Sequence, residues 1–382
     1  MTLCGGHPRI AGRGHCETSA PWELLRRGHI TVHYGGGSRL KDDLGRTTLE
    51  EIGGQPEDWE RLLRELRRRR NPLRGRAEVL LIGCGSQHYL ALTAAWVCRD
   101  VLRIPAEAAP ASEFLAFPHF YRPRRQRSLV VLVSRSGKTT EVVQACECAR
   151  EMGLRTLFLG AVEDAPLVGA ADESVVFPYL NEKSICTTRA TSGFLLALLW
   201  WCLEKWQRGK GWEALAGLPQ AGRAVVEEAE RVTCAVAEAV APRAAAFLGS
   251  GALYGLAREG ALKTNEMALI PTAAFHTLEY RHGPRSLAAP DVLVTGLVAH
   301  RSEMMLLEEA RGLGARTFAI GDAGREVEWS LPLECELGHL ARLPLYLMGL
   351  QMLGLQLARA RGLDPDAPRH LTRYVDLTGG QQ

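Results

Sequence analysis

Short apolar runs alternate with longer helical patterns along most of the chain, and this alternation sets the expected fold. The segments "VLLIG", "LVVLV", "TLFLG" and "SVVF" are short and mostly apolar, whereas stretches such as "HYLALTAAWVC" are longer and typical of buried helices. Strands that alternate with helices of this length form parallel sheets with right-handed crossovers. The pattern therefore predicts an α/β protein built from doubly wound parallel sheets of the flavodoxin-like type.

A strand, a Gly-x-Gly turn and a helix occur twice in the chain. Gly83 and Gly85 in "LLIGCGS" match Gly249 and Gly251 in "AFLGSGA", and the second copy continues with the apolar runs "DVLVTGLVA" and "ARTFAIGD". Such a repeat predicts an internal duplication and hence two doubly wound domains in tandem. Ligands of these sheets bind beyond the carboxyl ends of the strands, where both turns fall.

The domain limits follow from changes in this pattern. Residues 1–45 are rich in Gly, His and Arg without a sustained period, so we expect a poorly ordered arm. A helical pattern begins at Thr48, breaks at Gly53 and Gly54, and resumes at Pro56. We expect the first domain over residues 46–210 and the second over 211–382, joined near residues 206–222, where Gly and Pro supply a connection.

Composition excludes several classes of protein. The chain has 382 residues, of which 46% are hydrophobic and 23% charged, and its net charge is +3, which is typical of a soluble globular protein and not of a polybasic nucleic-acid binder. No apolar run reaches the roughly 18–20 residues of a membrane span, "FLLALLWWCLEKW" is expected to be a core helix, and a signal peptide is not evident. We therefore expect a cytoplasmic protein without membrane or nucleic-acid partners.

Cofactor and metal signatures are weak. The ten cysteines are scattered, without Cys-x-x-Cys pairs or zinc-ligand spacing, which favours buried free thiols. The first Gly-x-Gly turn has His88 where a dinucleotide fingerprint needs a third glycine, and no acidic residue follows at the required distance. We expect neither a metal nor a cofactor.

The segment "VVLVSRSGKTTEVVQA" indicates an anion site. Hydroxyls gather around Gly137 where an apolar strand gives way to a helix, and free backbone N–H groups and the helix dipole favour an anion there. The segment lacks a Walker motif, so one phosphate monoester fits better than a nucleoside triphosphate. A simple Ser/Thr helix cap is the alternative for this segment alone, but "NEKSICTTRATSGFL" supplies a second hydroxyl cluster in the same domain.

The second predicted domain supplies acid and base groups. Glu259, Lys263 and Glu266 in "REGALKTNE" recur on one helical face, where an exposed row of ion pairs is the alternative interpretation. His282 precedes Gly283 and Pro284, a turn that can leave the imidazole exposed. A carboxylate and a histidine near a phosphosugar pocket are what proton transfer between adjacent carbons requires.

Four motifs, "VSRSGKTTE", "REGALKTNE", "EYRHGP" and "ARGLDPDAPRHLTR", together resemble the tandem sugar-isomerase (SIS) domains. These domains form the isomerase half of glucosamine-6-phosphate synthase and occur in related sugar-phosphate isomerases and amino-sugar-phosphate deaminases. The likeness covers roughly residues 48–376, and "EYRHGP" also resembles the tagatose/galactosamine-6-phosphate branch. The resemblance implies a hexose or hexosamine 6-phosphate as ligand.

The resemblance also implies roles for single residues. Glu266 is the implied base that moves a proton between C1 and C2 through an enediol or enamine. His282 is implied to open the ring from a neighbouring subunit, which makes the active form a homodimer or larger. The implied ligands are Ser134, Ser136 and Thr139 for the phosphate and Ser86, Gln87 and the loop from Ile185 to Thr187 for the sugar.

Two departures from the family change the expected chemistry. Position 2 is Thr, where the synthase's glutaminase domain has a cysteine, and the chain leaves no room for that domain, so ammonia from glutamine is not expected. Arg373 aligns with the family's Schiff-base lysine, and an arginine cannot form an imine with the open-chain sugar. Lys263 could take that place or serve as an ion-pair partner, and Arg373 could still polarise the carbonyl.

The sequence thus favours a sugar-phosphate aldose–ketose isomerase, coupled to release of ammonia or an amine. A phosphosugar sensor without turnover is the first alternative, favoured by the missing lysine and opposed by Glu266 and His282. Removal of an amine from a fructosyl-amine 6-phosphate is the second alternative, which shares the fold and the proton chemistry.

Overall fold

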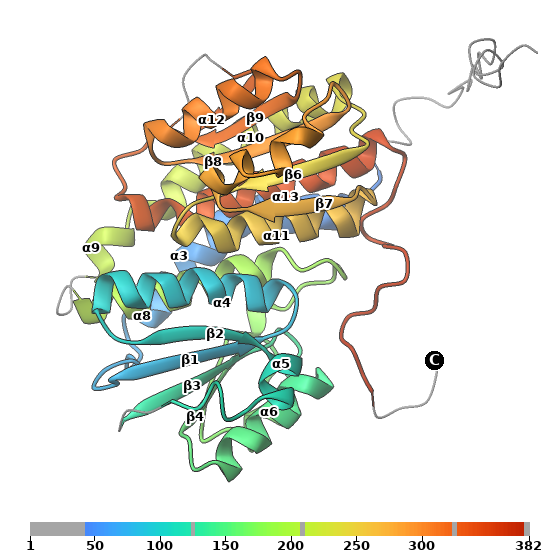
Figure 1. Cartoon of the computed structure of the whole chain (residues 1–382). Coiled ribbons are helices and arrows are strands. Elements are labelled where there is room, and N and C mark those ends of the chain that lie inside the picture. Colours follow the sequence, from blue (N-terminus) through green and yellow to red (C-terminus); the bar gives the residue numbers. More distant parts are fainter. Residues whose placement is uncertain (1–42, 124–126, 207–210, 323–326, 378–382) are drawn as a thin grey trace, which may run out of the picture. The chain divides into compact units, whose positions relative to one another are not determined.

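The predicted strands form two separate parallel sheets in the computed structural model (Figure 1), which describes residues 43–123, 127–206, 211–322 and 327–377. All described residues lie in one unit, residues 39–382. The arm predicted over residues 1–45 lies outside the described residues up to residue 42. The first sheet has the strand order β2-β1-β3-β4-β5. Its strands are β1 (Glu78–Gly83), β2 (Ala106–Pro110), β3 (Ser128–Val133), β4 (Thr156–Gly160) and β5 (Glu173–Val176).

The second sheet repeats the topology of the first. Its order is β10-β9-β8-β6-β7. Read from β7, its strands stand in the order second, first, third, fourth and fifth along the chain, as they do in the first sheet. Every neighbouring pair in both sheets is parallel. Its strands are β6 (Ala244–Leu248), β7 (Thr272–Phe275), β8 (Val292–Val298), β9 (Arg316–Gly321) and β10 (Trp329–Pro332). The predicted fold class, two doubly wound parallel sheets, is confirmed.

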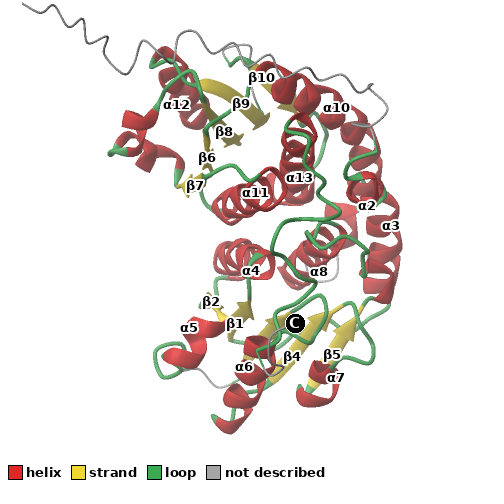
Figure 2. Cartoon of the chain, turned by 90° about the vertical axis from the view of Figure 1, so that its right-hand side faces the viewer, coloured by secondary structure: helices red, strands yellow, loops and turns green. Residues whose placement is uncertain are grey.

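Four long helices lie between the two sheets, and Figure 2 shows them as a double layer. Helices α4 (Ser86–Val97) and α8 (Arg189–Trp206) cover the first sheet, and α11 (Ala252–Ala268) and α13 (Leu343–Ala360) cover the second. Their buried side chains join the inner faces of both sheets in one continuous apolar cluster. Because this cluster spans both sheets, burial of apolar surface holds the two halves together.

The remaining helices cover the outer faces and one side of this double layer. Helices α5 (Ala111–Ala116), α6 (Thr140–Glu151) and α7 (Pro166–Ala170) pack on the outer face of the first sheet, and α12 (Arg301–Gly312) packs on that of the second. Helices α2 (Arg46–Gly53), α3 (Gln55–Leu66), α9 (Gly211–Leu215) and α10 (Leu218–Ala239) complete the fold. Helix α3 contacts both α8 and α10, so the N-terminal helices pack against helices from both halves of the chain.

The structure adds elements that the pattern did not predict. Strands β2, β7 and β10 each form an edge of a sheet and contain only four or five residues. An edge strand is covered less completely than a central one, so its sequence needs no long apolar run to mark it. The predicted connection over residues 206–222 contains α9 and the first turn of α10. Pro219 does not interrupt α10, because proline is tolerated in the first turn of a helix.

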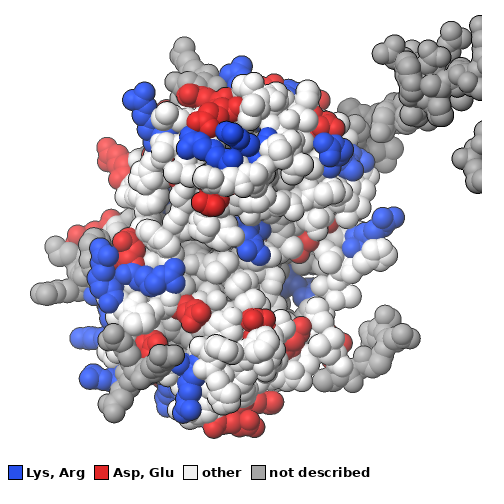
Figure 3. All heavy atoms as spheres, viewed as in Figure 1, with Lys and Arg blue, Asp and Glu red and all other residues white. Residues whose placement is uncertain are grey.

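Basic and acidic side chains are interspersed on the face drawn in Figure 3, so the described residues form no extended patch of one charge there. Helix α8, which contains the apolar stretch "FLLALLWWCLEKW", is a core helix as predicted, with Phe194, Leu199 and Trp201 almost wholly buried. Within the described ranges, no helix has the length and apolar character to cross a membrane.

Candidate active site

A cavity of about 230 Å³ lies at the carboxyl end of the first sheet, where the C-terminal tail and α11 close it. Ten of the eleven residues predicted for the site line this cavity: Ser86, Gln87, Ser134, Ser136, Thr139, Ile185, Thr187, Lys263, Glu266 and Arg373. They come from five segments that are far apart in the sequence. The segments that follow β1, β3 and β5 meet because parallel strands end at the same edge of a sheet, whereas α11 and the C-terminal tail reach the cavity from the second half of the chain.

The turn after β1 supplies two of these residues. Gly85 has φ 54°, a conformation that strains any residue with a Cβ, and the chain then enters α4 at Ser86 and Gln87. Gln87 donates from Nε2 to Thr191 Oγ1 at 3.4 Å, while its Oε1 is buried without a partner among the described residues. The buried oxygen is free to accept a hydrogen bond from a ligand hydroxyl.

The loop between β3 and α6 holds the hydroxyls predicted to bind a phosphate. Ser134 Oγ accepts from the N–H of Gly137 at 3.1 Å and Ser136 Oγ accepts from the N–H of Lys138 at 3.2 Å, which shapes a tight turn. Thr139 precedes the first residue of α6, yet its side chain makes no capping bond. The simple helix-cap interpretation therefore fails at Thr139, and the helix N-terminus faces the cavity with hydroxyls around it.

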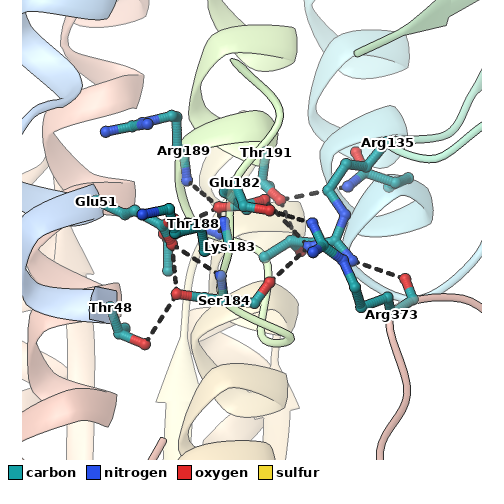
Figure 4. A network of polar contacts seen from close by, with 12 residues as sticks. Thr48, Glu51, Arg135, Glu182, Lys183, Ser184, Thr188, Arg189, Thr191 and Arg373 are labelled. Atoms are coloured by element: carbon teal, nitrogen blue, oxygen red, sulfur yellow. Dashed lines mark hydrogen bonds and ion pairs between the residues drawn. The ribbon is translucent and has the colours of Figure 1, made fainter. Parts of the chain in front are cut away.

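A second loop, residues 182–188, lies opposite residues 134–139, which we call the phosphate loop after their predicted role, and contributes Ile185 and Thr187. Thr191 Oγ1 donates to Thr187 Oγ1 at 3.0 Å. Two buried carboxylates hold the ends of the loop (Figure 4): Glu51 accepts from the N–H of Lys183 at 2.6 Å, and Glu182 accepts from the N–H of Thr188 at 2.8 Å. We call residues 182–188 the sugar loop after the predicted role of Ile185 and Thr187.

The predicted face of α11 carries a buried charge cluster at the cavity wall. Lys263 is 1% exposed and Glu259 is 0% exposed, so the alternative of an exposed ion-pair row is wrong. Lys263 Nζ lies 2.5 Å from Glu266 Oε2 and 3.7 Å from Glu259 Oε1. Of the three, only Glu266 keeps appreciable exposure, 19% of its side chain. Glu266 is therefore the carboxylate of this cluster that can reach a ligand.

Electrostatics separate the roles within this cluster. Burial raises the pKa of Glu259 to about 8, although the Lys263 charge opposes the rise. Burial alone would lower the pKa of Lys263, but the carboxylates of Glu266 and Glu259 together raise it above its usual value. Lys263 is thus held as an ammonium, which cannot attack a carbonyl.

The C-terminal tail crosses the mouth of the cavity. Residues 371–375 line it, the N–H of Thr140 donates to the carbonyl of Val375 at 3.2 Å, and the N–H of Leu377 donates to Thr140 Oγ1 at 3.0 Å. Arg373 donates from Nη2 to the carbonyl oxygen of Glu182. The tail thereby fixes Arg373 beside the sugar loop.

His282 is the one predicted site residue that the structure does not bring to the cavity. It follows the 3-10 turn Thr277–Arg281, is exposed, and does not line the cavity of its own chain. Its assigned role, in which it reaches the site of a neighbouring subunit, stays a prediction.

Sequence reasoning missed two residues near the site. Arg135 lies within the quoted motif "VSRSGKTTE" and lines the cavity at 4% exposure, and its place between two predicted phosphate ligands was the available signal. Glu51 lies in α2, far away in the sequence, and no local pattern connects it to the sugar loop. Over the described ranges, no group of three or more His, Cys, Asp or Glu side chains is arranged to hold a metal ion.

Comparison with known proteins agrees with this architecture. Residues 73–200 match the model of the SIS domain. The chain is 27% identical to the glutamine–fructose-6-phosphate aminotransferase [isomerizing] of Leifsonia xyli subsp. xyli over 78% of its own length and 52% of that protein, so it spans about half the length of the curated relatives it matches.

Solved structures match over most of the chain. The crystal structure of glucosamine-6-phosphate deaminase from Thermotoga maritima is 30% identical, with a TM-score of 0.71, covering 86% of this chain and 99% of that one. The tagatose-6-phosphate ketose/aldose isomerase from Escherichia coli has a TM-score of 0.70 at 23% identity, covering 88% of this chain and 97% of that one, and it shows the shared fold.

Proposed function

The chain belongs to the family of SIS-domain proteins and is similar to sugar-phosphate isomerases, and from this premise we propose that it is an amino-sugar-6-phosphate deaminase/isomerase. The proposed enzyme converts a hexosamine 6-phosphate and water to a ketose 6-phosphate and ammonia. The observation that carries the proposal is the placement of Glu266 in the wall of a cavity that also contains the phosphate loop.

The proposed division of labour follows the geometry. Ser134, Ser136 and Thr139 hold the phosphate at the N-terminus of α6. Glu266 carries the proton between C1 and C2, and the Lys263 ammonium keeps its carboxylate oriented. In the proposed dimer, His282 of a neighbouring subunit protonates the ring oxygen as the sugar opens.

The nitrogen chemistry of the proposed reaction needs no amine from the enzyme. Lys263 and Arg373 are the cationic candidates for imine formation at the cavity, one held as an ammonium and the other a guanidinium. We propose that the nitrogen is carried by the substrate and leaves as ammonia, without glutaminase activity.

A second candidate is the removal of an amine from a fructosyl-amine 6-phosphate. That reaction uses the same phosphate loop and the same proton carrier, and its leaving group likewise comes from the substrate. A phosphosugar sensor would use the cavity for binding alone.

One panel separates these candidates. Purified protein is incubated with glucosamine 6-phosphate, galactosamine 6-phosphate, a fructosyl-amino-acid 6-phosphate, and fructose 6-phosphate with either ammonia or glutamine, and mass spectrometry follows ketose and free amine. We expect turnover of a hexosamine 6-phosphate that disappears in Glu266→Gln. Binding of a phosphosugar without turnover of any substrate would contradict the enzyme proposal and favour the sensor.

A further inference from the structure

Glu182 is a buried carboxylate that does not line the cavity yet holds a segment that does. Its side chain is 0% exposed, and Oε2 accepts from the N–H of Thr188 at 2.8 Å, the hydroxyl of Thr188 at 3.2 Å and the N–H of Arg189 at 2.8 Å. These bonds close the sugar loop onto its own first residue. They also place a negative charge at the N-terminus of the long helix α8.

The other oxygen of Glu182 faces the phosphate loop. Oε1 lies 3.6 Å from Nη1 of Arg135, which is the residue between Ser134 and Ser136. The same Nη1 donates to the carbonyl of Ser184 at 2.8 Å, and Nη2 donates to the carbonyl of Arg373 at 2.7 Å. One guanidinium thus touches the sugar loop twice and the C-terminal tail once.

The tail returns this contact. Arg373 donates to the backbone carbonyl of Glu182 while its own carbonyl accepts from Arg135. Figure 4 shows the three side chains converging from the phosphate loop, the sugar loop and the tail. The contacts form a closed ring, so a shift of any one segment strains bonds to the other two.

Both members of the ion pair between Glu182 and Arg135 are buried, and their burial determines how costly it is to remove one of them. Burial raises the pKa of Glu182 and lowers that of Arg135, while their mutual attraction opposes both shifts. Removal of one partner leaves the other charge uncompensated inside the protein, which is far costlier than removal of both. The pair therefore specifies the relative position of the two loops and contributes little net stability by itself.

We propose that Glu182 is a positioning residue that, through Arg135, fixes the spacing between the phosphate loop and the sugar loop. The inference rests on the proposed function for the identity of the ligand, a sugar 6-phosphate that must reach both loops at once. Inorganic phosphate, in contrast, needs only the phosphate loop. The two ligands therefore report separately on the spacing of the loops and on the phosphate loop itself.

The test measures the affinity of fructose 6-phosphate and of inorganic phosphate by calorimetry for the wild type, Glu182→Gln, Arg135→Gln and the double variant. We expect each single variant to bind fructose 6-phosphate about tenfold more weakly or worse. For Glu182→Gln, whose side chain does not line the cavity, we expect phosphate affinity within about twofold of the wild type. The double variant is expected to bind the sugar phosphate better than either single variant, because no charge is left unpaired. If a single variant fails to fold, the affinities of the double variant can still be compared with those of the wild type.

Asp172→Asn is the matched control. Asp172 accepts from the N–H and the hydroxyl of Thr156 and lies 3.7 Å from Arg150, in the same half of the chain but away from the cavity. We expect it to lower the melting temperature without changing either affinity. Equal weakening of both ligands in Glu182→Gln, or no weakening of fructose 6-phosphate, overturns the positioning role.

The binding readout also separates this inference from the proposed function. If the wild type binds fructose 6-phosphate but turns over no substrate, the enzyme proposal fails while the affinities still decide the role of Glu182. If the wild type turns over a hexosamine 6-phosphate and both variants bind the sugar phosphate normally, only the positioning role fails. A wild type that does not bind fructose 6-phosphate overturns the inference.

Discussion

Lys263 Nζ lies 2.5 Å from Oε2 of Glu266, within one turn of α11 and at the wall of the cavity. The contact ties the predicted proton carrier to a buried cation that also lies 3.7 Å from a second acidic side chain, that of Glu259. A proton carrier must keep one orientation toward two adjacent carbons, and a fixed ion pair provides it. Because of this contact we expect Lys263 to take no part in covalent chemistry.

Trapping with borohydride tests this consequence. Because the neighbouring carboxylates raise the pKa of Lys263 and Arg373 is a guanidinium, we expect no imine between the protein and fructose 6-phosphate. Intact-mass spectrometry after reduction should show unmodified protein. A stable sugar adduct that maps to Lys263 would contradict this interpretation.

The phosphate loop predicts a separable effect on substrate binding. Each of the hydroxyls of Ser136 and Thr139 is expected to donate to a phosphate oxygen, and a hydrogen bond to a charged group contributes about 1.5–3 kcal/mol. Ser136→Ala or Thr139→Val should raise KM roughly 10- to 100-fold with little change in kcat. Steady-state kinetics with the substrate found in the panel measure this.

Ser174→Ala is the control for these two variants. Its hydroxyl donates to the carbonyl of Val168 at 3.3 Å and lies outside the cavity. KM should stay at the wild-type value. A drop in kcat without a change in KM for Ser136→Ala and Thr139→Val would argue against phosphate binding at this loop.

The raised pKa of Glu259 predicts how stability depends on pH. Because burial raises that pKa from 4.5 to about 8, the folded protein binds more protons than the unfolded chain between these values. The contribution of the protonated group is fully present below pH 4.5 and is lost as the pH rises through about 8. Glu259→Gln should abolish this loss, which is on the order of a few kcal/mol.

Chemical denaturation of both proteins at a series of pH values between about 5 and 9 measures how their free energies of unfolding differ. Wild type should lose stability relative to Glu259→Gln as the pH rises. A constant difference between the two proteins across the range would show that Glu259 titrates normally.

The proposed contribution of His282 from a neighbouring subunit predicts complementation. His282→Gln and Glu266→Gln should each be inactive alone, whereas mixed dimers contain one complete site. Co-refolding equal amounts should recover about a quarter of the wild-type activity, since half the dimers are mixed and each has one complete site of two. No recovery after verified subunit exchange would place His282 outside the active site.

The sequence predicted the framework of this protein because its signals are local. Continuous apolar runs marked the central strands, and the two Gly-x-Gly turns marked the start of α4 and α11. The hydroxyls of the phosphate loop could be found for the same reason, since strand, turn and helix start lie within one short motif.

The remainder of the site could not be predicted locally. The pairing of Glu51 with the sugar loop and of Arg135 with the tail joins segments far apart in the chain, and only the fold brings them into contact. Burial was equally invisible: the spacing of Glu259 and Lys263 suits an exposed ion-pair row, and the packing of α11 between α4 and α13 decides otherwise.

The most direct test of the account is hydrogen exchange at C1 of fructose 6-phosphate in deuterated water, followed by NMR. If Glu266 moves the proton between C1 and C2, the wild type should replace one C1 hydrogen with deuterium, and Glu266→Gln should exchange at least about 100-fold more slowly. Melting temperatures should show that the variant is folded. Exchange at the wild-type rate in Glu266→Gln, or no exchange in the wild type, would contradict the proposed role of Glu266.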